Sequence, residues 1–214
     1  MRYVVGLLLV GLLAVRPSPV RGQAGRQYGL TLGVNRGAIK SPDGRLGGHF
    51  GFVLGGVVRQ PLYASLAVQS GLLLSQKGTE VRNDEGGAIE YQAGYIELPL
   101  LLHLEAPLVQ SMVVYGEVGG FGAVKLFERQ TPGEGNLNVA LRTGRTFFQR
   151  FNAGLLAGIG ATIPIRDQRL NVTVRREWGL PDVARNVENQ PFPQVSFPRE
   201  GRTRTWSLLL RFGF

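Results

Sequence analysis

The C-terminal ten residues, Thr205–Phe214, read T-W-S-L-L-L-R-F-G-F. From Trp206 onward every second residue is large and apolar, and the positions between them are mainly small or charged, such as Ser207 and Arg211. A period of two indicates a β-strand, because successive side chains point to opposite faces. One face of this strand is apolar with an aromatic residue at each end. That pattern is typical of a strand that spans a bilayer, although soluble sandwich strands also show it.

The composition limits the classes of protein to which the chain can belong. Its 214 residues suffice for one domain, 43% of them are hydrophobic, and 31 are glycine. Cysteine is absent, which excludes a disulfide framework and thiolate chemistry. The net charge is +9, but no run of five basic residues occurs, so nucleic acid is not an expected partner.

The first 24 residues predict a cleaved secretory signal peptide. Arg2 provides a positive start, and Tyr3–Val15 is an apolar run of 13 residues, too short for the ~20 of a spanning helix. Gly22 and Ala24 are small residues at the −3 and −1 positions of a cleavage site after Ala24. A membrane anchor is the alternative. The remaining residues, 25–214, are expected to form one domain.

Alternating segments separated by turn signals follow Ala24, and no helical periodicity of useful length occurs. Eight strands are expected, at Tyr28–Asn35, His49–Val58, Leu62–Ser75, Ile89–His103, Met112–Leu126, Phe151–Ile163, Leu170–Glu177 and Thr205–Phe214. Pro99 lies inside the fourth strand and cannot donate a ladder hydrogen bond, so we expect a bulge or local irregularity there.

The connections between these strands alternate in length. Those after the second, fourth and sixth strands are short, whereas long loops are expected at Arg36–Gly48, Gly78–Gly87, Phe127–Phe148 and Leu180–Arg202. Aromatic residues gather near the strand ends. This layout predicts an all-β, eight-stranded, antiparallel up-and-down transmembrane barrel with short periplasmic turns and longer external loops. A secreted barrel of the lipocalin type is the alternative, with apolar residues inside and polar ones outside.

Two stretches resemble PorT-like outer-membrane β-barrel proteins. They are Gly71–Gly78, which reads G-L-L-L-S-Q-K-G, and Tyr95–Leu102, which reads Y-I-E-L-P-L-L-L. Gly154–Gly160 and Trp178–Leu180 fit later strands of that family. The resemblance implies an eight-stranded barrel similar to OmpA and OmpX in the bacterial outer membrane, with a role in protein secretion. The departures are Gly71, where an acidic residue is common, and Arg176, which lies on the outward parity of its strand.

The last strand also resembles the C-terminal assembly signal of bacterial outer-membrane proteins. The residues concerned are Trp206, Leu208, Leu210, Phe212 and Phe214. The resemblance implies that the barrel assembly machinery is a partner. Outer-membrane lipid, including lipopolysaccharide, is the second expected partner, and its anionic headgroups would be met by Arg199, Arg202 and Arg204 unless these belong to a solvated loop.

Candidate catalytic groups are few. The two histidines, His49 and His103, are expected near opposite ends of the barrel, so they cannot share a metal ion. An acylase or acyltransferase acting on lipid A needs a serine and a histidine close together at one rim, and His49 has only loop serines such as Ser41 near it. The glycine-rich stretches Gly119–Gly122 and Gly158–Gly160 are not phosphate cradles, because no helix follows them. No catalytic residue, cofactor or metal site is therefore expected.

Charged residues on the inward parity are the most informative candidates. They are Glu97, Glu117, Lys125, Arg175, Glu177 and Arg211. An eight-stranded barrel is just wide enough for side chains to fill it, and buried charges are tolerated when they pair. We expect a salt-bridged lumen that serves stability, with a gated ion path as the alternative. The predicted function is a non-enzymatic outer-membrane barrel that acts structurally or by binding through its external loops; a lipid-modifying enzyme is the alternative.

Overall fold

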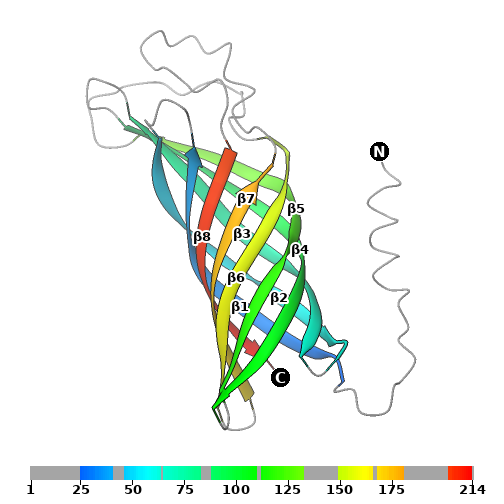
Figure 1. The fold of residues 1–214 in the computed structure, drawn as a ribbon. Helices are drawn as coiled ribbons and strands as arrows, with labels where there is room; N and C mark the ends of the chain where they lie inside the picture. The colour runs from blue at the N-terminus through cyan, green and yellow to red at the C-terminus, as the bar shows by residue number, and fades with distance from the viewer. Residues whose placement is uncertain are drawn as a thin grey trace, which may run out of the picture.

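Eight β-strands form the fold in a computed structural model of the chain (Figure 1). The structure describes residues 25–40, 46–63, 65–82, 88–109, 112–132, 149–165, 168–180 and 202–213. The strands are β1 (Gln27–Lys40), β2 (Leu46–Pro61), β3 (Leu66–Arg82), β4 (Ala88–Val109), β5 (Met112–Pro132), β6 (Phe151–Ile165), β7 (Gln168–Gly179) and β8 (Arg202–Gly213). The predicted signal peptide and its cleavage site after Ala24 lie outside the described residues.

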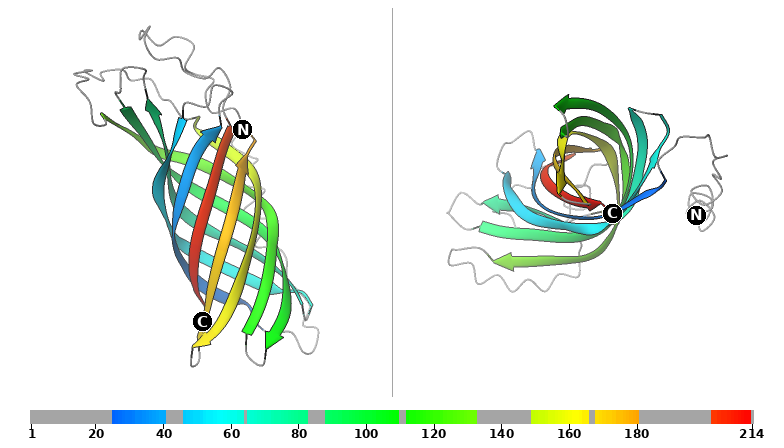
Figure 2. Two further views of the ribbon diagram at one scale, coloured as in Figure 1. Left: turned by 60° about the vertical axis from the view of Figure 1, so that its left-hand side comes forward. Right: turned by 90° about the horizontal axis from the view of Figure 1, so that it is seen from below.

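The first and last strands close the sheet into a barrel. Leu32 on β1 lies opposite Leu54 on β2 and opposite Leu210 on β8, and all three strands are antiparallel. Every other strand pairs with its neighbours in the sequence, so the strand order around the ring is the chain order. Figure 2 shows the ring along its axis. The prediction of a closed, eight-stranded, antiparallel up-and-down barrel is confirmed.

The wall of the barrel is apolar outside and polar inside. Leu30, Leu100 and Ile159 are each more than half exposed on the outer face, whereas Thr31, Gln69 and Thr173 are almost fully buried. A soluble lipocalin-type barrel requires the reverse arrangement, so that alternative is wrong. A lipid bilayer requires a closed sheet that leaves no backbone group unpaired and that presents aliphatic side chains outward. No helix among the described residues is long and apolar enough to cross a membrane.

The strands extend farther toward the external end than the sequence indicated. β1 continues to Lys40, β3 to Arg82 and β5 to Pro132, and β2 begins at Leu46. The expected loops Arg36–Gly48, Gly78–Gly87 and Phe127–Phe148 are therefore wrong where they overlap these strands. Leu180–Arg202 overlaps a strand only at Arg202.

The reason is that charged side chains do not interrupt a ladder of backbone hydrogen bonds. Glu80 on β3 lies opposite Glu90 on β4, and the pairing continues to Arg82 opposite Ala88. Toward the external end polar and charged residues such as Gln76, Glu80, Glu90 and Gln92 take the outward positions, so the apolar alternation ends while the pairing continues. Alternation therefore marks the lipid-facing part of a strand and not its whole length.

The wall is taller on one side. β4 has 22 residues and β5 has 21, about twice the 9–11 that cross a bilayer, whereas β7 and β8 have 12 each. Figure 1 shows the long strands reaching beyond the others at the end opposite the C-terminus. The short connections, at residues 62–65, 110–111 and 166–167, lie at the other end, where β1 begins and β8 stops. That end is periplasmic by the rule that periplasmic turns are short.

Pro99 produces the expected local irregularity but no bulge. The β3–β4 ladder lapses at Gly71 and Leu72, between Ser70 opposite Leu100 and Leu73 opposite Glu97, and it resumes without a change of register. Ser70 Oγ donates a hydrogen bond to the Pro99 carbonyl oxygen at 2.9 Å. The register of β4 against β5 shifts instead between Gly94 and Tyr95. A Cβ atom on Gly94 would lie 2.3 Å from the ring of Phe127, so the missing side chain makes room for that ring.

Candidate functional site

Lys77 joins two opposite walls of the barrel. It lies on β3, and its Nζ atom is 2.5 Å from Glu97 Oε1 on β4 and 2.5 Å from Glu177 Oε2 on β7. In a ring of eight strands β3 and β7 are four apart, which places them on opposite sides of the lumen. All three residues are at most 5% exposed. The Lys77 ammonium also lies 4.8 Å from the ring centre of Phe121, a cation–π contact.

A second cluster gathers around Glu117 on β5. Arg175 Nε on β7 donates a hydrogen bond to Glu117 Oε1 at 2.6 Å. The other carboxylate oxygen lies 3.1 Å from His103 Nε2 on β4 and 3.7 Å from Arg211 Nη2 on β8. Four strands thus contribute to one buried group of charges, and the side chain of Glu117 has no exposed surface.

Glycines on β6 permit these contacts. Glu117, Gly158 and Arg175 occupy one row across β5, β6 and β7. A Cβ atom on Gly158 would lie 3.1 Å from both Cγ and Oε1 of Glu117, so any side chain would stand between the acid and the guanidinium group. Gly160 has the same position between Tyr115 and Thr173, whose hydroxyl groups are 2.6 Å apart. These two positions of β6 therefore require glycine, because side chains of the neighbouring strands β5 and β7 meet over them.

The six inward charges expected from the sequence fall into three groups. Glu117 meets Arg175 and Arg211, and Glu97 and Glu177 meet through Lys77. Lys125 stands apart from these two clusters as the third group, because its Nζ atom pairs with Glu128 Oε2 at 2.6 Å on the same strand.

Two members of the clusters were not among the residues expected there. Lys77 was missed because the third strand was expected to end near Ser75; the odd-numbered inward parity of β3 simply continues to Lys77 and Thr79. His103 was expected near the periplasmic end and was not counted among the lumen charges. It is 1% exposed, lies opposite Glu117 in the β4–β5 ladder, and packs against Tyr115 with ring centroids 5.2 Å apart. Counting the inward parity to the true end of β3 would have identified Lys77, and including histidine among the inward polar residues of the fourth strand would have identified His103.

His49 lies at the external end of β2. Gln92 Nε2 donates to His49 Nε2 at 2.9 Å, and His49 Nδ1 is 4.0 Å from Glu90 Oε2. An amide and a carboxylate are not nucleophiles of the serine type, so these contacts do not form the pair that acyl transfer requires. Among the described residues no three His, Cys, Asp or Glu side chains are grouped so as to hold a metal ion.

Arginine and tryptophan alternate on the outer face near the external end of β7, β8 and β1. The guanidinium carbon of Arg176 lies 4.5 Å from the ring centre of Trp206 and 5.7 Å from that of Trp178. Arg36 lies opposite Trp206 on the other side, and its guanidinium carbon is 5.7 Å from the ring centre of Phe50. We call Arg36, Arg176, Trp178, Arg204 and Trp206 the outer aromatic–arginine patch.

Comparison with protein families identifies the chain. Residues 18–185 match the family described as outer membrane protein beta-barrel domain. The chain belongs to this family. The match covers most of the sequence, and with the closed barrel and its apolar outer face it places the protein in the bacterial outer membrane. The finer resemblance to PorT-like proteins is not part of this match.

Solved structures of small outer-membrane barrels are similar to this family member. Neisserial surface protein A has a TM-score of 0.49 at 12% identity, over 89% of this chain and 100% of the other. Ail, the attachment invasion locus protein of Yersinia pestis, in complex with the heparin analogue sucrose octasulfate, has a TM-score of 0.42 at 12% identity, with the same coverage. The N-terminal barrel of Pseudomonas aeruginosa OprF has 0.36 at 11%, over 86% and 97%. A comparison with curated proteins finds no match.

The C-terminal strand of this barrel faces lipid as its alternation indicates. Trp206, Leu208 and Phe212 are exposed on the outer face, and Leu210 is partly exposed. Phe214 lies outside the described residues, as does Arg199. Arg202 and Arg204 are exposed at the external start of β8.

Proposed function

We propose that this family member is a non-enzymatic outer-membrane barrel with a closed lumen, acting structurally or by binding at its external end. The observation that supports this most directly is Lys77, whose ion pairs with Glu97 and Glu177 connect opposite walls. An eight-stranded barrel encloses little more than its own side chains, so a bridge across the ring leaves no continuous water path. Function then belongs to the loops and the protruding strands β3–β5.

The closed lumen is tested by electrical recording of the purified barrel in planar bilayers. We expect no steady conductance from the wild type, because Lys77 and the Glu117 cluster fill the interior. The double variant Lys77→Ala, Arg175→Ala should conduct if it still folds, which the mobility shift between unboiled and boiled samples reports. Steady conductance of the wild type would refute the closed lumen, and deacylation of lipid A that is lost in His49→Ala would refute the non-enzymatic assignment.

We further propose, from the PorT resemblance alone, that the protein supports protein secretion or surface assembly. Deleting its gene should then change which proteins reach the cell surface and the medium, as measured by quantitative mass spectrometry. Restoring the wild-type gene should reverse the change. A secreted and surface protein set that is identical with and without the gene would show that the role lies elsewhere.

We also propose that the outer aromatic–arginine patch contacts phosphate groups of lipopolysaccharide. Arg176 and Arg36 flank Trp206 on adjacent strands, and the three side chains face away from the lumen near the external end. Tryptophan favours the membrane interface, and arginine pairs with phosphate through two parallel hydrogen bonds. Cationic side chains at that depth would neutralise the anionic headgroups of the outer leaflet.

The lipid proposal is tested by measuring the lipopolysaccharide retained by the purified barrel with native mass spectrometry. Arg176→Gln should retain several-fold less than the wild type, because both the charge and the stacking on Trp206 are lost. Arg129→Gln is the matched control, since Arg129 is an exposed arginine on β5 outside the patch. Equal retention by both variants would contradict the proposal.

A further inference from the structure

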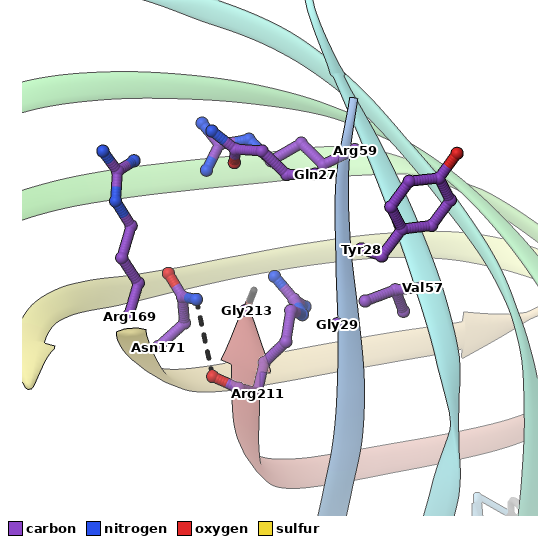
Figure 3. A pocket seen from close by; sticks show the side chains of 9 residues that line it. All are labelled: Gln27, Tyr28, Gly29, Val57, Arg59, Arg169, Asn171, Arg211 and Gly213. Atoms are coloured by element: carbon purple, nitrogen blue, oxygen red, sulfur yellow. Dashed lines mark hydrogen bonds between the residues drawn. The ribbon is translucent and has the colours of Figure 1, made fainter. Parts of the chain in front are cut away.

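A cavity of about 210 Å³ opens at the periplasmic end of the lumen. Figure 3 shows its lining, which comes from the starts of β1 and β7 and the ends of β2 and β8. The space is large enough for several water molecules or one small ion with its hydration. It lies at the opposite end of the barrel from the outer aromatic–arginine patch, so the two features are independent.

Three arginines line this cavity. They are Arg59 on β2, Arg169 on β7 and Arg211 on β8. Arg169 is exposed at the mouth, whereas Arg211 is 5% exposed and lies deeper. None of the described residues that line the cavity is acidic; the remaining polar side chains are those of Gln27, Tyr28 and Asn171.

Arg211 has hydrogen-bonding capacity left over. Its Nε and Nη2 atoms are buried and have no hydrogen-bond partner among the described residues. Nη2 lies 3.7 Å from Glu117 Oε2, beyond hydrogen-bonding distance, and the other oxygen of that carboxylate accepts from Arg175 at 2.6 Å. A buried guanidinium group whose nearest acid is this distant is incompletely compensated, so an anion in the adjoining cavity would stabilise its charge.

The acids near the cavity are already engaged. Glu105 forms an ion pair with Arg59, and Glu117 is shared between Arg175 and Arg211. Arg169 adds a further positive charge at the mouth. The cavity is therefore electropositive, which favours an anion with several acceptor oxygens.

We propose that this cavity is a binding site for a small oxyanion of the phosphate type that enters from the periplasm. The guanidinium group of Arg211, which lines the cavity, would attract the anion from below, because its planar charge suits a phosphate or carboxylate group. Arg169 at the mouth would add a second cation. The volume excludes a nucleotide or a disaccharide as a whole occupant, although the phosphate group of a larger molecule could enter. Such a site would add ligand binding at the periplasmic end, a property that follows neither from the family nor from the closed lumen.

The test is calorimetric titration of inorganic phosphate into the full barrel in phosphate-free maltoside micelles at low chloride. The wild type should bind one phosphate saturably. Arg169→Gln should weaken binding about tenfold, because a hydrogen bond to a charged group is lost. Arg129→Gln carries the same charge change at the external end and should bind as the wild type does.

Each other outcome has a defined meaning. Absence of saturable binding in the wild type, or equal affinity in Arg169→Gln, would overturn the proposal. Equal weakening in Arg129→Gln would show that net charge alone attracts phosphate and would also overturn it. Arg211→Lys keeps the charge but removes the planar guanidinium group, and it should weaken binding while the heat-induced mobility shift confirms folding.

The source of the anion is resolved by repeating the titration in nanodiscs. Weaker phosphate binding in discs that contain phosphatidylglycerol than in phosphatidylcholine discs, at a salt concentration that screens the charge of the disc surface, would mean that a lipid headgroup competes for the site. Equal binding in both would assign the site to a free anion. Failure of this proposal would leave the closed lumen untouched, since conductance is measured separately.

Discussion

Lys77 on β3 donates a hydrogen bond to Glu177 on β7, 100 residues later in the chain and on the opposite side of the lumen. The same ammonium group also meets Glu97 on the adjacent strand β4. One lysine thus neutralises two buried carboxylates that would otherwise repel each other. The contact ties the N-terminal half of the barrel to the C-terminal half.

Replacing Lys77 should destabilise the barrel strongly. Lys77→Ala leaves Glu97 and Glu177 buried without their cation, and breaking a buried ion pair in this way costs about 3–5 kcal/mol. Unfolding in urea, followed by tryptophan fluorescence of the barrel in lipid, measures the change. Lys125→Ala removes a lysine whose partner, Glu128, lies on its own strand, and it should cost clearly less. Equal losses in the two variants would contradict a special role for the bridge across the lumen.

The two arginines near Glu117 should contribute differently to the stability of the barrel. Arg175 donates to Glu117 at 2.6 Å, whereas Arg211 lies 3.7 Å away. Arg175→Ala should therefore lower the free energy of unfolding more than Arg211→Ala does. Urea unfolding of both variants under identical conditions gives the order. A larger loss for Arg211→Ala would mean that the charge around Glu117 is distributed differently from the arrangement described.

A side chain at Gly158 should force apart the acid and base that meet over it. The added Cβ atom of Gly158→Ala would lie 3.1 Å from Glu117 Cγ, and overpacking of this kind costs about 1–3 kcal/mol. Gly116→Ala is the matched control, because a Cβ atom there meets nothing within 4 Å. The comparison uses the urea midpoint of each variant. If Gly116→Ala is as destabilising as Gly158→Ala, loss of glycine itself and not the crowding of Glu117 would be responsible.

Removing the last residue should impair assembly if the C-terminal strand is read by the barrel assembly machinery. A chain that ends at Gly213 lacks Phe214, the terminal aromatic residue of the pattern. We expect several-fold less heat-modifiable barrel in the outer membrane, measured by electrophoresis of unboiled membranes. Phe214→Tyr keeps a terminal aromatic ring and should assemble normally. Normal assembly of the shortened chain would rule out this use of Phe214.

Processing after Ala24 should yield a mature protein that begins at Gly25. Mass spectrometry of protein extracted from the outer membrane measures this directly. Ala24→Arg puts a large charged residue at the −1 position, which should block cleavage and leave the precursor in the cell. Finding Met1 on the protein in the outer membrane would contradict the prediction.

The number of strands, their order and the identity of the lipid-facing side chains followed from the sequence. Alternation between Trp206 and Phe212, and in seven earlier segments, is a local property, because a β-strand turns every second side chain to the same face. Closure then followed from the requirement that no backbone group remain unpaired in lipid. The strand ends did not follow, because ladders such as Glu80 opposite Glu90 continue where the outward residues are no longer apolar and the alternation disappears.

The partners inside the lumen were decided only by the tertiary structure. Parity placed Glu97, Glu117, Arg175 and Glu177 on the inner face, but it does not specify which strand lies across the ring at which height. That depends on the stagger of eight strands, to which every register and bulge contributes. Lys77 could therefore be matched with Glu177 only after the barrel had closed, because a contact between opposite walls is the sum of all the local registers and is encoded in no one of them.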